Sequence, residues 1–206
     1  MRMITGFLPP TAGTAVISGH DIRTAPVAAK RVIGYLPENA PAYESMTVTN
    51  FLRFAADMRG IRGENSAAAI ERAIERCRLQ AVRHRSIGTL SKGYRQRACF
   101  AQAILHDPPI LIMDEPTDGL DPNQKHTVRE MIKEMAASKA IIISTHILEE
   151  VDAVCTRAMI ISDGRIVANG TPDELKTKSP SGRLDDVFRM LTIGAHEETV
   201  KHGEAA

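Results

Sequence analysis

Two adjacent carboxylates, Asp114 and Glu115, are the side chains best suited to chemistry, and they close the apolar run 110–113. A continuous apolar run of this length is typical of a buried strand in a parallel sheet, and such sheets bind ligands at the carboxyl ends of their strands. Two acids there could divide the work of nucleotide hydrolysis, with one holding Mg2+ and the other orienting the attacking water. The pair could equally belong to a solvated loop or cap a helix, so the interpretation depends on the neighbouring segments.

Three neighbouring segments supply that support. Residues 90–97, Leu-Ser-Lys-Gly-Tyr-Arg-Gln-Arg, open a helical pattern upstream, and residues 119–122, Gly-Leu-Asp-Pro, and 144–146, Ser-Thr-His, follow downstream. In this order the four segments resemble the signature motif, Walker B strand, D-loop and switch histidine of the ABC-type ATPases. The resemblance extends over nearly the whole chain and implies the α/β fold of the P-loop NTPases, with a helical subdomain.

The signature-like segment would bind nucleotide through Ser91, Lys92, Gly93 and Gln96. By resemblance, the Ser91 hydroxyl and the Gly93 amide hold the γ-phosphate of ATP bound to a second subunit, at a helix N-terminus that favours anions. The segment departs from the commonest family pattern, because Lys92 replaces a glycine and Tyr94 a glutamine. We expect Lys92 to add positive charge near the phosphate. The alternative is that Ser91 only caps the helix that follows.

The resemblance assigns roles to four further residues. Glu115 would orient water and Asp114 would hold Mg2+, while Glu38, at the position of the Q-loop glutamine, would offer another oxygen to the metal or its water. His146 would contact the γ-phosphate as the switch histidine. Glu38 could instead be a turn residue, and His146 a structural histidine at the end of a strand.

Asp121 has two equally weighted interpretations. In the family, the D-loop aspartate lies across the contact between two nucleotide-binding subunits. Here Asp121 also precedes Pro122 and a periodic helical pattern, which is the arrangement of an N-cap before a first-turn proline.

The resemblance implies ATP and Mg2+ as cofactors, held between two nucleotide-binding subunits in a homo- or heterodimer. Residues 90–94, 34–38 and 184–188 look most like the ABC-2-type exporters. The expected partner is therefore an ABC-2-type membrane permease subunit, met through residues 38–60, and the expected location is the cytoplasmic face of the cell membrane. A translation or DNA-repair ATPase of the same family is less favoured, because neither a second nucleotide unit nor a long coiled-coil insertion is present.

The expected P-loop is missing from the printed sequence. Its pattern, G-x-x-x-x-G-K-[ST], needs a Gly-Lys pair, and the 206 residues contain none. Residues 1–10 resemble the latter part of the helix that follows the P-loop, so we expect the chain to start within that helix and to lack about 40 family residues. Such a polypeptide should bind ATP poorly by itself. An alternative function is therefore a non-catalytic subunit or fragment that supplies only the signature half-site.

Composition and patterning are compatible with one domain over residues 1–206, partial at its N-terminus. The chain is 43% hydrophobic with a formal charge of +1, which gives no sign of a nucleic-acid surface, and three scattered cysteines without a metal spacing suit a reducing cytosol. No apolar run approaches the length of a membrane span.

Alternating strand and helix patterns predict a parallel α/β sheet. We expect strands near 14–17, 32–36, 110–113, 140–143 and 158–161, a helical insert over 40–89 whose helix is capped by Asn65 or Ser66, and a C-terminal tail over 170–206. A turn at 163–164 predicts a hairpin, and residues 171–174, Thr-Pro-Asp-Glu, predict a capping box.

Overall fold

The computed structural model describes residues 1–39 and 41–192, which fall into two compact units, Met1–Ser144 and Thr145–Ala206. Within the described residues, every helix is too short or too polar to cross a bilayer.

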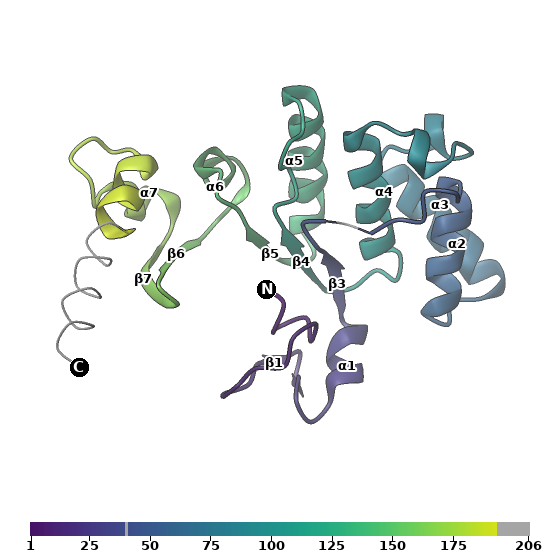
Figure 1. The fold of residues 1–206 in the computed structure, drawn as a ribbon, viewed down its shortest axis with the longest axis horizontal. Coiled ribbons are helices and arrows are strands. Elements are labelled where there is room, and N and C mark those ends of the chain that lie inside the picture. The colour runs from purple at the N-terminus through teal and green to yellow at the C-terminus, as the bar shows by residue number, and fades with distance from the viewer. Residues whose placement is uncertain (40, 193–206) are drawn as a thin grey trace. The chain divides into compact units, whose positions relative to one another are not determined.

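The first unit is built on a three-stranded parallel sheet in the order β3-β4-β5 (Figure 1). Its strands are β3 (Ile33–Leu36), β4 (Ile110–Asp114) and β5 (Ala140–Ser144). The central strand is the most buried, because Leu111, Ile112 and Met113 are almost completely covered. This confirms the predicted α/β fold with a parallel sheet, in which buried strands form continuous apolar runs.

Along the chain, one long helix comes before β4 and another comes after it. Helix α4 (Lys92–Ile104) precedes it and helix α5 (Pro122–Ala136) follows it. Both bury the faces that their sequence periodicity predicts, including Ala98 and Ala101 on α4 and Met131 and Ile132 on α5.

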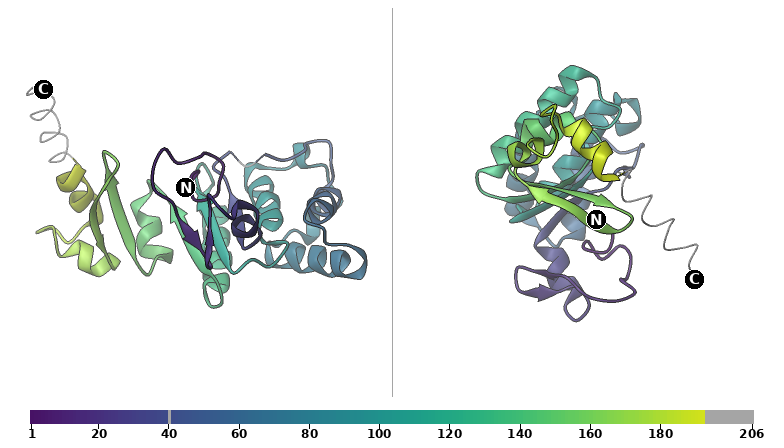
Figure 2. Two further views of the ribbon diagram at one scale, coloured as in Figure 1. Left: turned by 90° about the horizontal axis from the view of Figure 1, so that it is seen from below. Right: turned by 90° about the vertical axis from the view of Figure 1, so that its left-hand side faces the viewer.

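Residues 41–91 are mainly helical. They contain α2 (Val48–Met58), α3 (Gly63–Arg76) and the short 3-10 helices η1 (Gln80–Val82) and η2 (Ile87–Thr89). Helices α2, α3 and α4 contact one another and lie side by side in the views of Figures 1 and 2. The boundary 40–89 for a helical subdomain stays a prediction, and residue 40 lies outside the described residues.

The N-terminal part differs from expectation. Residues 1–8 form turns rather than the end of a helix, with hydrogen bonds from Thr5 N to Met1 O at 3.2 Å and from Gly6 N to Met3 O at 3.0 Å. A short segment without a cap does not repay the cost of helix nucleation, so the expected helix does not form. The strand expected at 14–17 is reduced to β1 (Val16–Ile17), which pairs with β2 (His20–Asp21), and α1 (Pro26–Arg31) follows.

The start of α3 is also different. The helix begins at Gly63, after Arg62, and no side chain caps it. Asn65 and Ser66 therefore lie inside the first turn, where Ser66 is buried, and neither is the predicted cap.

The second unit contains α6 (Leu148–Val154), the antiparallel hairpin of β6 (Ala158–Ser162) and β7 (Arg165–Gly170), and α7 (Pro172–Lys176). The hairpin and the capping box are both as predicted: Glu174 N donates to Thr171 Oγ1 at 3.2 Å, and Thr171 N donates to Glu174 Oε2 at 2.8 Å. Residues 184–192 are helical. Of the expected tail, residues 193–206 lie outside the described part.

Candidate functional site

The carboxyl ends of the three parallel strands bring the predicted acidic residues to one edge of the sheet. Asp114 pairs in register with Ser144 of the neighbouring strand, and the Ser144 hydroxyl donates a hydrogen bond to Asp114 Oδ1. Glu115 follows directly. Glu38 is exposed and comes two residues after Leu36, at the same edge. The sheet thus places an aspartate, a glutamate and a hydroxyl where parallel sheets bind ligands.

Glu115 is held in an unusual backbone conformation. Its φ is +48°, in the left-handed region that non-glycine residues rarely adopt. Hydrogen bonds on both sides maintain it, because Glu115 N donates to Ser144 O at 3.1 Å and Glu115 O accepts from Asp118 N at 3.2 Å. Such strain is often found at functional positions, where the surrounding structure fixes the direction of a side chain.

The first turn of α4 begins with the signature-like residues. Ser91 Oγ accepts a hydrogen bond from Tyr94 N at 3.4 Å, so Ser91 is the N-cap of this helix. Gly93 packs against Gln124 so closely that a Cβ atom at position 93 would lie 2.6 Å from Gln124 Oε1. One turn further on, Gln96 Nε2 donates to Pro116 O at 3.3 Å. The start of α4 therefore lies against the loop that follows β4.

Lys92 is directed toward that loop. Its Nζ atom lies 3.7 Å from Asp118 Oδ2, and a Cβ atom added to Gly119 would overlap Nζ. The ammonium group is thus partly neutralised by Asp118. A contact between Lys92 and phosphate stays a prediction.

Asp121 caps α5, since its Oδ1 atom accepts from Gln124 N at 3.0 Å. The helix-cap interpretation of Asp121 is therefore confirmed, and its D-loop role stays a prediction. The cap also gives residues 115–121 a fixed end.

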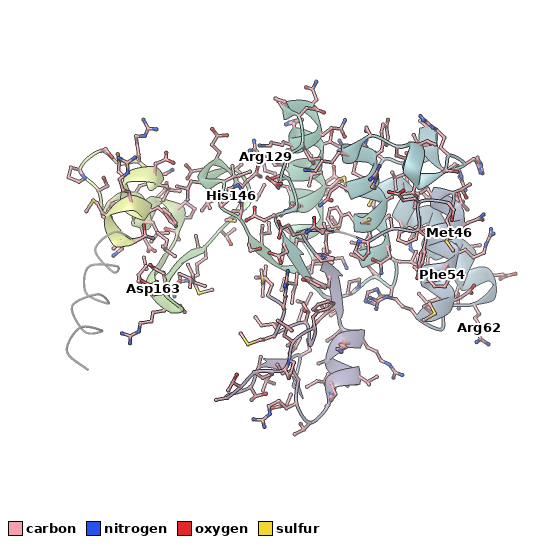
Figure 3. The ribbon with its side chains drawn as sticks, viewed as in Figure 1. Met46, Phe54, Arg62, Arg129, His146 and Asp163 are labelled. Atoms are coloured by element: carbon pink, nitrogen blue, oxygen red, sulfur yellow. The ribbon has the colours of Figure 1, made fainter. Side chains whose placement is uncertain are left out.

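His146 belongs to the second unit and comes two residues after the end of β5 (Figure 3). The backbone beside it is held by Thr145, whose Oγ1 atom accepts from Ile147 N at 3.0 Å. The switch role of His146 stays a prediction.

The residues at the strand ends fit a magnesium nucleotide by their chemistry. Magnesium is usually held by one or two carboxylates together with substrate phosphates and water, and Asp114, bonded to the Ser144 hydroxyl, would offer one such carboxylate. The start of α4 supplies the amide-rich helix N-terminus and the glycine that phosphate binding favours.

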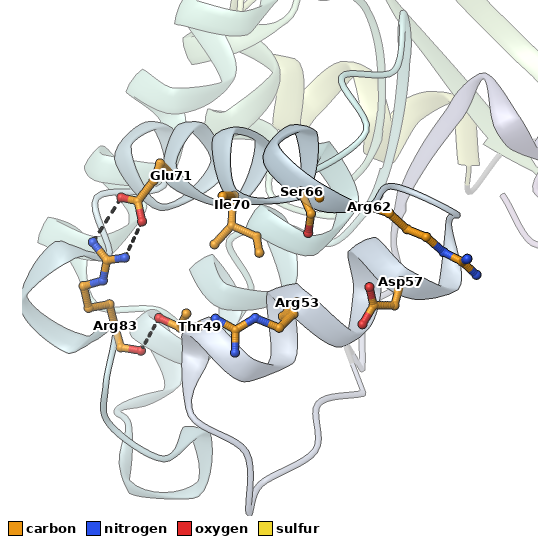
Figure 4. A pocket seen from close by; sticks show the side chains of 10 residues that line it. Thr49, Arg53, Asp57, Arg62, Ser66, Ile70, Glu71 and Arg83 are labelled. Atoms are coloured by element: carbon orange, nitrogen blue, oxygen red, sulfur yellow. Dashed lines mark hydrogen bonds and ion pairs between the residues drawn. The ribbon is translucent and has the colours of Figure 1, made fainter.

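The described part of the chain also contains a hollow of about 340 Å³, which lies between α2 and α3 (Figure 4). Ile70 lines it together with Arg53 and Asp57. At one end, Arg83 forms an ion pair with Glu71. None of the predicted site residues lines this hollow.

Sequence reasoning missed the residues that join the site together. The sequence pattern assigns no ligand role to Ser144 and no role to Pro116, Asp118 or Gln124. Ser144 could have been found, because it directly follows the apolar run at 140–143 that predicts a strand. The other contacts depend on how α4 packs on the loop.

Known proteins resemble this chain in sequence. A family model described as ABC transporter matches residues 1–118. The uncharacterized ABC transporter ATP-binding protein YxlF of Bacillus subtilis is 36% identical over 85% of this chain and 58% of YxlF. The probable multidrug ABC transporter ATP-binding protein YbhF of Escherichia coli is 31% identical over 90% of this chain and 32% of YbhF. The chain thus spans less than two thirds of either relative.

Two solved structures have the same fold. An ATP binding subunit of an ABC transporter superposes with a TM-score of 0.77 at 31% identity, covering 92% of this chain and 80% of that one. An ATP-binding cassette described as dimeric, in a post-hydrolysis state with ADP and Pi, superposes with a TM-score of 0.73 at 19% identity, covering 82% of this chain and 78% of that one.

Proposed function

Because this chain belongs to the ABC transporter family of ATP-binding proteins, we propose that it is an ATP-binding and ATP-hydrolysing subunit of an ABC-type exporter. The observation that carries the proposal is the position of Asp114 and Glu115 at the end of β4, on a loop against which the start of α4 is anchored by Gln96. This arrangement gathers the acidic side chains and the groups proposed to bind phosphate around one segment.

In the proposed mechanism, Glu115 would orient the attacking water and Asp114 would hold Mg2+. The bound metal would neutralise charge on the phosphates, which is its usual contribution to phosphoryl transfer. The Ser144 hydroxyl fixes the Asp114 carboxylate through their hydrogen bond. Glu38 is proposed as a further oxygen near the metal, and His146 as the residue that contacts the γ-phosphate.

The second half of the mechanism uses the start of α4. Ser91, Gly93 and Gln96 are proposed to bind the phosphates of ATP held mainly by a second nucleotide-binding subunit, with Lys92 adding charge and Asp121 lying near the contact. The dimeric state of the ATP-binding cassette that shares this fold supports two subunits acting together. ATP would close the pair and hydrolysis would open it.

A second candidate function is that of a non-catalytic subunit. It would contribute only its signature half-site, which begins with Ser91 at the N-cap of α4, to ATP bound by its partner.

An ABC-2-type membrane permease is the proposed transport partner. Tyr43, Phe54 and Met58 lie within residues 38–60 and are exposed, and the rings of Tyr43 and Phe54 meet edge to face with centroids 5.3 Å apart. Exposed apolar side chains that gather in one region favour a protein contact. The name of YbhF, a probable multidrug transporter protein, supports an exporter. The subunit would then sit on the cytoplasmic face of the membrane through its partner.

Two substitutions, tested in the assembly purified from membranes of the native cells, distinguish the candidate functions. Glu115→Gln removes the proposed water-orienting group, while Ser91→Ala removes the group that acts on ATP held by the other subunit. A catalytic subunit should lose at least about 100-fold in ATP hydrolysis with either substitution. A half-site subunit should lose activity only with Ser91→Ala.

Ser91→Ala also removes a helix cap, so Thr171→Ala is its control. Thr171 caps α7 in the same way, with its Oγ1 atom accepting from Glu174 N at 3.2 Å. Hydrolysis should survive Thr171→Ala. Unchanged hydrolysis in both Glu115→Gln and Ser91→Ala would contradict the proposed function in either form.

A further inference from the structure

Lys92 occupies a position where a helix disfavours positive charge. It is the first residue of α4, and the helix dipole places partial positive charge at this end. The side chain is well exposed, yet its ammonium group is directed to Asp118, with Nζ 3.7 Å from Oδ2. This ion pair joins the first turn of α4 to the turn that follows β4.

The same ammonium group is packed on Gly119. A Cβ atom at position 119 would overlap Lys92 Nζ, so the contact requires a residue without a side chain. Gly119 also has a φ of +61°, which glycine adopts without strain. Glycine at position 119 thus allows both the positive φ of the turn and the close approach of the Lys92 ammonium group.

Helix α4 therefore holds the loop 115–121 at two places. Gln96 donates to Pro116 O near the start of the loop, and Lys92 holds Asp118 and Gly119 in its middle. Glu115 lies at one end of the loop and Asp121 at the other, where it caps α5. A displacement of Asp118 would disturb its backbone hydrogen bond with Glu115 O, one of the two that hold Glu115.

We propose that Lys92 is a positioning residue that fixes the loop 115–121 on the first turn of α4, through Asp118 and Gly119. It acts on the proposed hydrolysis through the loop, by supporting the backbone turn that holds Glu115. The inference rests on the proposed function only for the role of Glu115.

Amide hydrogen exchange of the peptide spanning residues 114–122, in the full chain without nucleotide, tests the contact. Two amides in it report directly, because Asp118 N donates to Glu115 O at 3.2 Å and Leu120 N to Thr117 O at 3.3 Å. Lys92→Met and Asp118→Asn should each raise the exchange rate about two- to fivefold, as expected for a partly exposed ion pair. Lys92→Arg should restore protection.

Lys133→Met is the matched control, because Lys133 forms a comparable ion pair with Glu130 at 3.5 Å on α5. It should leave exchange of the 114–122 peptide unchanged. Salt should accelerate exchange in the wild-type chain but have little effect in Lys92→Met, since only the wild type has the ion pair to screen. Equal exchange in wild type and Lys92→Met, or no rescue by Lys92→Arg, would overturn the inference. Because no nucleotide is present, either result leaves the proposed function standing.

A second measurement tests the packing on Gly119. Gly119→Ala should lower the melting temperature more in the wild-type background than in Lys92→Ala, because the shortened side chain no longer overlaps the new methyl group. An equal decrease in both backgrounds would contradict the contact.

Discussion

At the scale of single residues, the cost of the strained backbone at Glu115 can be measured separately from the loss of its side chain. Its φ of +48° costs a non-glycine residue about 1 kcal/mol. Glu115→Gly and Glu115→Ala both remove the carboxylate, but only glycine relieves the strain. Thermal unfolding should therefore place Glu115→Gly about 2–4 °C above Glu115→Ala.

A pair of substitutions at Glu130, inside α5, serves as the control. There the order should be reversed, because glycine is about 1 kcal/mol worse than alanine within a helix. The same order at both positions would show that residue 115 is not strained.

The part of the site that lies at the ends of the strands was predictable from the sequence. Asp114 and Glu115 close an apolar run, and parallel strands must present their ends at one edge, so their location follows from the pattern. The direction of Lys92 did not follow, because it depends on where Asp118 and Gly119 lie after the loop folds onto α4.

At the scale of elements, the close approach of β3 to α4 predicts a strong effect at Gly34. A Cβ atom there would overlap Ala103 O and lie 2.6 Å from Leu111 Cδ2, and a backbone oxygen cannot swing away. Gly34→Ala should reduce the free energy of unfolding by about 1–3 kcal/mol in urea titration.

Gly170→Ala provides the comparison. The nearest atom to its added methyl group is Glu174 Oε2 at 2.9 Å, at the end of a flexible side chain. Gly170→Ala should lower the free energy of unfolding much less than Gly34→Ala. Equal costs at the two positions would contradict the packing of β3 on α4.

His106 contacts the end of α2 and strand β3, and its surroundings predict that the free energy of unfolding depends on pH. Its Nε2 atom lies 2.9 Å from Arg59 Nη1, at the end of α2, and 3.1 Å from Ile33 O on β3. Burial, with a contribution from Arg59 and a smaller one from Lys139, lowers the pKa of His106 to about 4. The unfolded chain takes up its proton near pH 6.5, so stability should fall as the pH drops from 6.5 to 4.

The size of this effect is about 1–2 kcal/mol, because the ring is only partly buried. Urea titrations between pH 4 and 7 should show a steeper loss for the wild type than for His106→Asn. Asp107, whose pKa is lowered chiefly by its hydrogen bond with Lys139, remains in both proteins. Parallel curves would contradict the assignment to His106.

The element boundaries show where sequence patterns succeed and where they fail. The apolar strands at 110–113 and 140–143 extend by one residue to Asp114 and Ser144, as expected of strong apolar runs. The helix expected at the start is absent, because residues 1–8 have no cap and too few turns to repay the cost of helix nucleation.

At the scale of the whole molecule, β5 has a strand neighbour on one side only within the described sheet. Ile142 on this strand is 41% exposed, and apolar edge strands favour association between chains. Ile142→Lys should reduce light scattering during heating. Met58→Lys, which adds the same charge to an exposed position on α2, should have a smaller effect.

A sharp, reversible thermal transition of the wild-type monomer would contradict this tendency to associate. The prediction follows from the exposed strand alone. It is independent of the proposed function.

The most direct test of a hydrolytic site at the end of β4 is the nucleotide content of the assembly, purified from native membranes after incubation with Mg·ATP. Glu115→Gln should retain ATP, because water is no longer oriented for attack, whereas the wild type and the exposed-acid control Glu75→Gln should hold ADP. ADP in Glu115→Gln at the wild-type level, or no nucleotide in any of the three assemblies, would contradict a hydrolytic site at the end of β4.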